Sequence, residues 1–170
     1  MIDQEIKAAA ARVLDLCRAR RLKIATAESC TGGLVAAALT EIPGSSDVVE
    51  GGFVTYSNET KHKLLGVPAA VLATHGAVSR ETAEAMAHGA RVKSGAHLAV
   101  AITGIAGPDG GSEEKPVGLV HFAAVTHEGD LIARERRFGD IGRAAVRRLS
   151  VLEALALLEQ LAMRRDVKPG

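Results

Sequence analysis

Aromatic residues are almost absent from this chain, which has no tryptophan, one tyrosine and three phenylalanines among its 170 residues. Proteins that hold single-stranded nucleic acid stack the bases on aromatic side chains, and this chain has too few for such a surface. Charge of one sign is not in excess either, because 21 Lys and Arg balance 20 Asp and Glu to a formal net charge of +1. Nothing global attracts nucleic acid or an acidic membrane, so we expect neither partner.

Cysteine and long apolar runs are also scarce. Cys17 and Cys30 are too few for a disulfide framework, and no apolar run approaches the ~20 residues of a membrane-spanning helix. Residues 1–11 lack the features of a signal peptide. We expect a cytoplasmic protein with one domain over residues 1–170, of which about 164–170 form a loose tail.

The spacing of apolar residues predicts alternating helices and strands. Intervals of three and four residues indicate helices at 4–20 and 143–163. Further helices are expected at 34–40, 58–65, 68–74 and 79–93, and strands at 22–27, 48–56, 97–103, 119–126 and 131–138. Strands and helices alternate early and a strand hairpin comes late. We therefore expect an α/β fold of three α/β/α layers, in which a mixed sheet is covered by helices on both faces.

Three polar loops follow predicted strands, at residues 28–33, 56–61 and 103–118. In open α/β sheets, ligands bind in the crevice outside the carboxyl ends of the strands. The three loops are therefore expected to share one site.

The first of these loops reads Glu-Ser-Cys-Thr-Gly-Gly and leads directly into a predicted helix. Free backbone N–H groups at a helix start favour a phosphate or a developing oxyanion. Ser29 is then a nucleophile beside an oxyanion hole, a ligand of a phosphate, or part of a helix cap with Thr31 as N-cap. The loop matches neither Gly-x-Ser-x-Gly nor the Walker A pattern.

A nucleophilic serine needs a base, and the six histidines show no spacing that offers one. Lys61 is preferred, because burial can lower a lysine pKa from about 10.4 toward about 7–8. The alternative is a solvated lysine on an exposed helix. Tyr56 precedes it by five residues and can face the same cleft. Cys30 is the rival nucleophile, since a helix start can depress its pKa.

The third loop adds further polar groups. The hydroxyl of Thr103 and the N–H groups of Gly104 and Ile105 are expected to form a second polar lip, and residues 107–115 a lid. No His, Cys, Asp or Glu set has metal-ligand spacing, so no metal is expected. Three arginines near the start of the last helix either bind an anion or form a solvated face: Arg143, Arg147 and Arg148.

Four motifs, taken in order and spacing, resemble the CinA C-terminal domain family over almost the whole chain. They are Ala-Glu-Ser-Cys-Thr-Gly-Gly (27–33), Tyr-Ser-Asn-Glu-Thr-Lys (56–61), Thr-Gly-Ile-Ala-Gly-Pro (103–108) and Glu-Lys-Pro-Val-Gly (114–118). The resemblance implies an amidohydrolase that converts nicotinamide mononucleotide to nicotinic acid mononucleotide and ammonia, without metal or organic cofactor. It also implies a homodimer or larger homo-oligomer.

The resemblance assigns Ser29 as nucleophile, Lys61 as base and Tyr56 as an assisting residue, with the backbone of residues 31–33 holding the oxyanion. It implies a substrate-binding set of Glu28, Cys30, Thr31, Gly32, Gly33, Thr103, Gly104, Ile105 and Arg143. Arg143 is the expected phosphate anchor, although the family's Gly-Asp-Arg is here Gly-Asp-Ile-Gly-Arg. The alternative function is a non-catalytic module of the same family that binds a nucleotide or a protein and needs neither Lys61 nor Tyr56. A third possibility is hydrolysis of another amide or of a pyrophosphate.

Overall fold

The computed structural model describes residues 2–164, so most of the tail expected at 164–170 lies outside the described residues. Each predicted helix and strand is present, with ends within two residues of those expected. The elements are α1 (Gln4–Ala19), β1 (Ile24–Glu28), α2 (Leu34–Thr40), the 3-10 turn η1 (Ser45–Asp47), β2 (Val49–Val54), α3 (Asn58–Leu65), α4 (Ala69–His75), α5 (Arg80–Ser94), β3 (Leu98–Gly104), β4 (Leu119–Thr126), β5 (Leu131–Arg137) and α6 (Arg143–Met163). None of the helices in residues 2–164 has both the length and the apolar character needed to cross a bilayer.

The five strands form one mixed sheet in the order β2-β1-β3-β4-β5. Strand β1 pairs in parallel with both β2 and β3, whereas β4 and β5 continue the sheet as an antiparallel hairpin. The carboxyl ends of β2, β1 and β3 therefore reach the same edge of the sheet.

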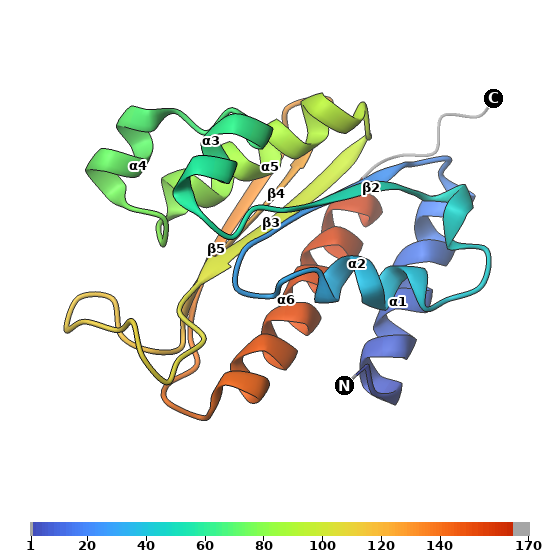
Figure 1. The fold of residues 1–170 in the computed structure, drawn as a ribbon. Coiled ribbons are helices and arrows are strands. Elements are labelled where there is room, and N and C mark those ends of the chain that lie inside the picture. Colours follow the sequence, from blue (N-terminus) through green and yellow to red (C-terminus); the bar gives the residue numbers. More distant parts are fainter. Residues whose placement is uncertain (1, 165–170) are drawn as a thin grey trace.

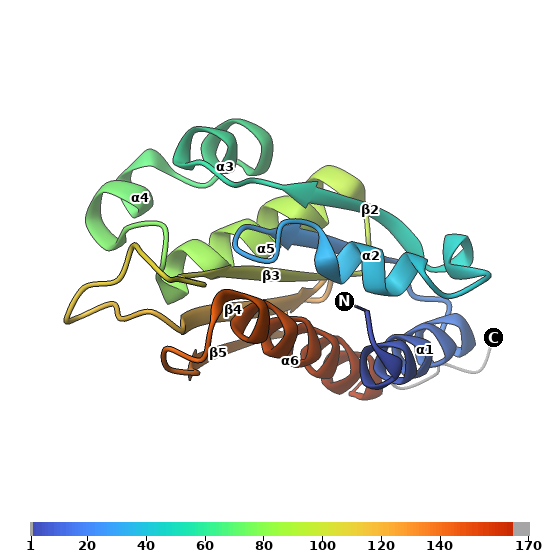
Figure 2. The ribbon, with the colours of Figure 1, turned by 60° about the horizontal axis from the view of Figure 1, so that its bottom comes forward.

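Helices cover both faces of the sheet, as expected from the sequence. Figures 1 and 2 show α1, α2 and α6 on one face and α3, α4 and α5 on the other. The α/β fold of three layers is confirmed.

The strand sequences explain why the two faces differ. Along β3, Leu98, Val100 and Ile102 join the core beneath α1, α2 and α6. The alternating residues Ala99 and Ala101 face α5 instead and belong to a second core. Because alanine is small, α5 can lie close to this face of the sheet.

Helix α3 rests on α5 through a close backbone approach. A Cβ atom added to Gly89 of α5 would lie 2.0 Å from the carbonyl oxygen of Leu65, the last residue of α3. Any side chain at position 89 would therefore push the two helices apart.

Helix α2 begins differently from the prediction. Thr31, expected as its N-cap, does not cap it; the N-cap is Gly33, which offers no side chain. The carboxylate of Glu28 accepts hydrogen bonds from the N–H groups of Val35 (2.8 Å) and Ala36 (3.1 Å). A carboxylate at the start of a helix accepts hydrogen bonds from the helix's unpaired N–H groups and interacts favourably with the positive end of the helix dipole. Glu28 thereby joins the end of β1 to α2 and fixes the turn between them.

Candidate active site

The three polar loops meet at the carboxyl edge of the parallel strands, around a cavity of about 270 Å³. In Figure 1 the loop after β1, the loop after β3 and the start of α6 gather on one side of the molecule. The cavity is lined by Ser29, Cys30, Tyr56, Lys61, Ala77, Val78, Thr103, Gly104, Ile105, Ala106, Gly107, Asp109, Gly110 and Arg143. Residues of all three loops therefore line the same cavity, as expected.

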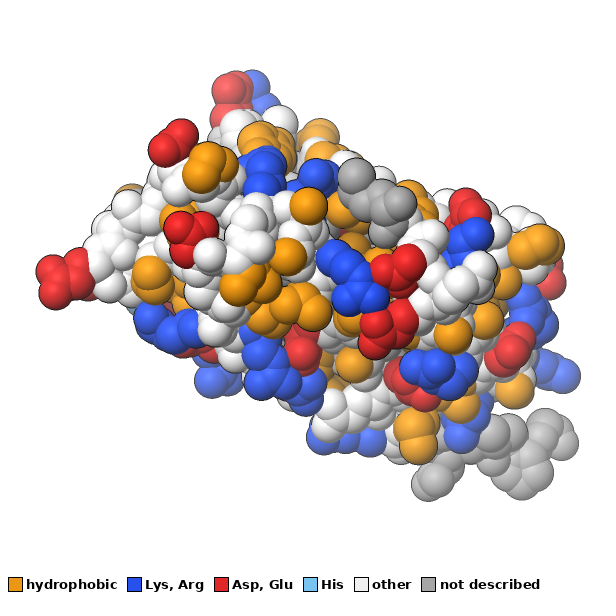
Figure 3. Space-filling model, turned by 90° about the horizontal axis from the view of Figure 1, so that it is seen from below, with side chains coloured by type: hydrophobic (Ala, Val, Ile, Leu, Met, Phe, Trp, Pro, Cys, Tyr) orange, Lys and Arg blue, Asp and Glu red, His pale blue; other side chains and the backbone are white. Residues whose placement is uncertain are grey.

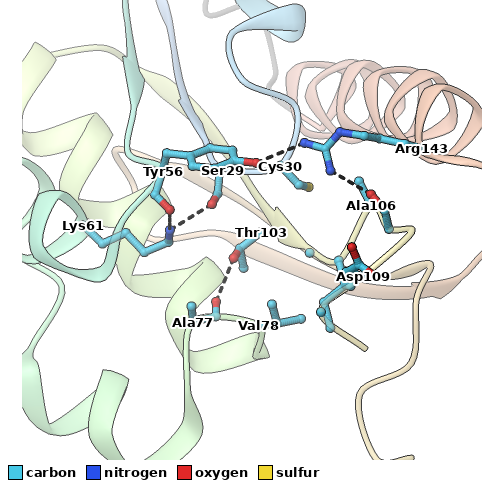
Figure 4. A pocket seen from close by; sticks show the side chains of 14 residues that line it. Ser29, Cys30, Tyr56, Lys61, Ala77, Val78, Thr103, Ala106, Asp109 and Arg143 are labelled. Atoms are coloured by element: carbon cyan, nitrogen blue, oxygen red, sulfur yellow. Dashed lines mark hydrogen bonds between the residues drawn. The ribbon is translucent and has the colours of Figure 1, made fainter. Parts of the chain in front are cut away.

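Ser29 lies directly after β1, with 8% of its surface exposed. Its N–H donates to the carbonyl of Ile102 in β3 at 3.0 Å, and its carbonyl accepts from Gly32 at 3.0 Å. These bonds hold the serine at the end of the sheet, and its hydroxyl faces the cavity (Figure 4).

Lys61 reaches this hydroxyl from the first turns of α3. Ser57 and Thr60 form a reciprocal capping box that fixes where the helix starts. The lysine is only 1% exposed, and its Nζ lies 2.9 Å from Ser29 Oγ. The same atom donates to the backbone carbonyl of Thr55 at 2.7 Å (Figure 4 shows the lysine beside the serine).

Burial lowers the pKa of Lys61 from 10.5 to about 8, against a smaller opposing effect of Cys30. No carboxylate within residues 2–164 forms an ion pair with Lys61. At pH 7, Lys61 is therefore a neutral amine in about one molecule in ten. One N–H of that amine is bonded to the Thr55 carbonyl, and the nitrogen lone pair can accept the proton of the Ser29 hydroxyl.

Cys30 lines the cavity but is poorly suited to attack. Burial raises the pKa of its thiol to about 12, and the charge of Glu28 acts in the same direction. The helix start that was expected to lower this pKa is already bound by Glu28. A protonated, 5% exposed thiol is a weak nucleophile, so the structure favours Ser29 over Cys30.

Tyr56 and Arg143 form the rim of the cavity. The tyrosine hydroxyl accepts from Arg143 Nη2 at 3.0 Å, and Arg143 Nη1 donates to the carbonyl of Gly107 at 2.9 Å. In Figure 4 the arginine reaches in from α6 toward the tyrosine ring. Within the described residues, no hydrogen bond joins the Tyr56 hydroxyl to Ser29 or Lys61, so its contacts place it at the mouth of the cavity.

Thr103 organises the opposite wall instead of presenting a free hydroxyl. It is buried, and its Oγ1 donates to the carbonyl of Ala77 at 2.7 Å. This bond brings Ala77 and Val78 to the cavity, a segment that no motif in the sequence indicated. The N–H of Ile105 donates to Leu119 at 2.9 Å. Ile105 therefore lines the cavity, but its N–H is bonded within the protein and does not belong to the polar lip expected there.

Some expected site residues do not line the cavity. Glu28, Thr31, Gly32 and Gly33 are not among the residues that line it, and the Gly32 N–H is already bonded to the Ser29 carbonyl. Within the expected oxyanion segment of residues 31–33, the Gly32 N–H is therefore used inside the loop. None of the six histidines lines the cavity, and no metal-binding group of His, Cys, Asp or Glu occurs in residues 2–164.

Comparisons with known proteins match this architecture. The model of the CinA C-terminal domain matches residues 6–162. A nicotinamide-nucleotide amidohydrolase PncC of Escherichia coli (strain K12) is 51% identical over 161 residues, covering 94% of this chain and 96% of the relative. A crystal structure of the competence/damage inducible protein CihA from Agrobacterium tumefaciens superposes with a TM-score of 0.93 at 52% identity, covering 97% of this chain and 99% of that chain.

Other relatives are longer. A CinA-like protein of Synechococcus sp. (strain RCC307) is 54% identical over 147 residues, covering 86% of this chain but 35% of the relative. One from Geobacter sulfurreducens is 49% identical over 93% of this chain and 37% of the relative. The chain thus spans about a third of the length of these CinA-like relatives.

Proposed function

The chain belongs to the CinA C-terminal domain family, and on that premise we propose that it is a nicotinamide-nucleotide amidase. Its substrate is nicotinamide mononucleotide, and its products are nicotinic acid mononucleotide and ammonia. The amidase domain corresponds to the matched residues 6–162. The observation that carries the proposal is the 2.9 Å contact between Ser29 Oγ and the buried Lys61 Nζ.

The first half of the reaction forms an acyl-enzyme. Neutral Lys61 takes the Ser29 proton as Oγ attacks the carboxamide carbon, and the carbonyl oxygen becomes an oxyanion. Backbone N–H groups of the loop that follows Ser29 are its proposed donors. Lys61 then passes the proton to the amide nitrogen, the C–N bond breaks, and ammonia leaves an ester on Ser29.

The second half releases the acid. Lys61 is neutral again after ammonia departs, and it takes a proton from a water molecule that attacks the ester carbon. The ester bond breaks, the proton returns to Ser29 Oγ, and nicotinic acid mononucleotide is released. In sum, one water is consumed for each ammonia formed, and the reaction requires no electron transfer.

The substrate phosphate is proposed to lie at the rim, on Arg143. Its guanidinium is exposed and forms no ion pair with a carboxylate of residues 2–164. Its described partners are the uncharged oxygens of Tyr56 and Gly107. An arginine without a competing anion suits bidentate recognition of a phosphate, while the carboxamide lies deeper, at Ser29.

The non-catalytic alternative gives no reason for the burial of Lys61. Keeping a protonated lysine with a pKa of about 8 instead of 10.5 costs about 3 kcal/mol of folding free energy at neutral pH. A module that only binds nucleotides gains nothing from that cost, whereas a serine hydrolase needs the neutral amine. We therefore favour the enzyme.

The cellular setting is part of the same proposal. We place the enzyme in the cytoplasm, where the buried Cys17 and Cys30 stay as the free thiols of the structure. A homodimer or larger homo-oligomer stays a prediction that light scattering of the purified protein tests.

Ammonia release from nicotinamide mononucleotide by the purified protein tests the function. We expect activity in the wild type and in Cys30→Ala, and a loss of at least about 10³-fold in Ser29→Ala. Mass spectrometry after rapid acid quench should find the nicotinoyl-nucleotide ester on the peptide that contains Ser29.

Two results would contradict the proposal. A folded wild type that releases no ammonia from this substrate would remove the assigned activity. Activity that survives Ser29→Ala but disappears in Cys30→Ala would move the nucleophile to the thiol.

A further inference from the structure

The loop that carries Ser29 is held at its ends by the backbone bonds of Ser29 and by Glu28 at the start of α2, and the stretch between them depends on glycine. Between β1 and α2 it contains Gly32 and Gly33, which adopt left-handed φ values of 60° and 103°. Glycine reaches such conformations at little steric cost, and for the same reason it does not fix them. A loop that must hold a nucleophile to a fraction of an ångström therefore gains from a further contact on the residues between its two held ends.

Arg147 of α6 supplies contacts of that kind. Its Nε donates to the carbonyl of Cys30 at 3.2 Å, and its Nη2 to the carbonyl of Thr31 at 3.4 Å. The arginine stands more than a hundred residues away in the sequence, so the two bonds join the last helix to the nucleophile loop. They lie on the two residues directly after Ser29.

The charge of Arg147 has no other described use. No carboxylate of residues 2–164 forms an ion pair with it. It does not line the cavity, whereas Arg143, one helical turn earlier, does. A half-buried guanidinium that binds two peptide carbonyls, and neither an acid nor the cavity, is suited to holding backbone.

Holding these carbonyls also orients the amides. A peptide group is planar, so fixing the Cys30 carbonyl fixes the direction of the Thr31 N–H. A charged donor on a carbonyl also polarises the same peptide and strengthens its N–H as a donor. The arginine therefore acts on the N–H groups of the loop that follows Ser29, among which the oxyanion donors are proposed, and on the direction of Ser29.

We propose that Arg147 is a positioning residue of the amidase. It holds the Cys30 and Thr31 peptides, so that Ser29 is oriented for attack and the loop N–H groups are oriented toward the oxyanion. The inference rests on the proposed function for its catalytic half. Its structural half, the anchoring of the loop, does not depend on which substrate is hydrolysed.

Arg148 provides a matched control. It is the next residue of the same helix, but it binds the carboxylates of Asp3 (2.6 Å) and Glu5 (2.5 Å) on the surface. The variants Arg147→Gln, Arg147→Lys and Arg148→Gln are compared with the wild type by steady-state kinetics with nicotinamide mononucleotide. Amide hydrogen exchange of the peptides covering residues 28–36 is measured on the same proteins.

We expect Arg147→Gln to lower kcat by about 10- to 100-fold while KM changes less than about threefold, since misplacement of the nucleophile affects the transition state. Exchange in residues 28–36 should accelerate at least about tenfold. Arg147→Lys, which keeps the charge but not the two-pronged contact, should fall in between. Arg148→Gln should match the wild type in kcat and in exchange.

Three results would overturn the inference: an unchanged kcat in Arg147→Gln, a raised KM with an unchanged kcat, or exchange rates equal to those of Arg148→Gln. Wild type that releases no ammonia would instead remove the proposed function. In that case the exchange rates alone decide whether Arg147 anchors the loop, with acceleration supporting the anchor and equal rates rejecting it.

Discussion

Two regions of this molecule use their cations differently. Around the cavity, Lys61, Arg143 and Arg147 bind hydroxyl and carbonyl oxygens, which carry no formal charge. On β5 and the outer side of α6, Arg134 and Arg136 bind Glu153 at 2.6 and 3.0 Å, and Arg148 binds Asp3. Figure 3 shows basic and acidic side chains interspersed on that side of the molecule.

The difference separates two uses of charge. A cation that already has a carboxylate contributes little to stability at the surface and has little attraction left for another anion. A cation bound only by uncharged oxygens costs more to bury, but it can still respond to a phosphate, a proton or a developing oxyanion. Three experiments test whether this contrast follows function.

The largest effect is expected from Lys61→Met compared with Lys63→Met. Both lysines lie on α3, but Lys63 is exposed and pairs with Glu59. Removing the base should lower kcat by about 10²- to 10⁴-fold, and Lys63→Met should leave kcat within about twofold. Ammonia release measures both, and circular dichroism confirms the folds. Equal activity of the two variants would remove the distinction between the two regions.

The pH dependence is expected to be the next largest effect. Attack requires the neutral amine, so kcat/KM, which reports the pKa of the free enzyme, should rise up to about tenfold for each unit of pH below the Lys61 pKa of about 8, and then level off. Between pH 6 and 8 this amounts to about 50-fold. The rate of ammonia release across pH 6–9.5 measures it.

Stability gives an independent check of the same pKa. The unfolded lysine titrates near 10.5 and the folded one near 8, so the folded state binds fewer protons between these values. The free energy of unfolding of the wild type, relative to Lys61→Met, should therefore be constant below pH 8 and increase toward pH 10.5. A kcat/KM profile that is flat from pH 6 to 8 would argue against Lys61 as the base.

The smallest of the three effects is expected at the rim. Arg143→Gln should raise KM for nicotinamide mononucleotide by about tenfold, the lower end of the loss expected for a charged hydrogen bond. Nicotinamide riboside, which lacks the phosphate, should be hydrolysed equally by the variant and the wild type. Arg136→Gln, which breaks a surface ion pair, should leave KM unchanged and cost less than about 1 kcal/mol of stability. A loss of equal size with both substrates would mean that Arg143 does not bind the phosphate.

The sequence predicts much of this site because its residues follow strands. The apolar periodicity locates β1, β2 and β3, and parallel strands bring the residues after them to one edge. The proximity of Ser29 and Lys61 follows from that topology, and the resemblance of the motifs pointed to the same pair. Local pattern and connectivity are sufficient to bring these two residues together.

Other contacts depend on distances that no local pattern contains. The buried Glu28 binds the start of α2 and takes the cap expected of Thr31, because a strand end and a helix start lie close only in the folded chain. Ala77 reaches the cavity through Thr103, 26 residues away. Arg147 differs from Arg148 in its neighbours and not in its own chemistry, so the sequence could not separate an anchor from a surface cation.

Gly89 links the packing of the second helical layer to the chemistry. Because Gly89 has no side chain, α3 can pack so closely that a Cβ atom at this position would lie 2.0 Å from the Leu65 carbonyl oxygen. Lys61 belongs to the same short helix, so the depth at which its amine meets Ser29 is set by the absence of one methyl group on a neighbouring helix. A spacer of that size would displace α3 by about 1 Å, enough to uncouple a proton acceptor from its donor. The distance between the Lys61 amine and Ser29 thus depends partly on a residue that does not line the cavity.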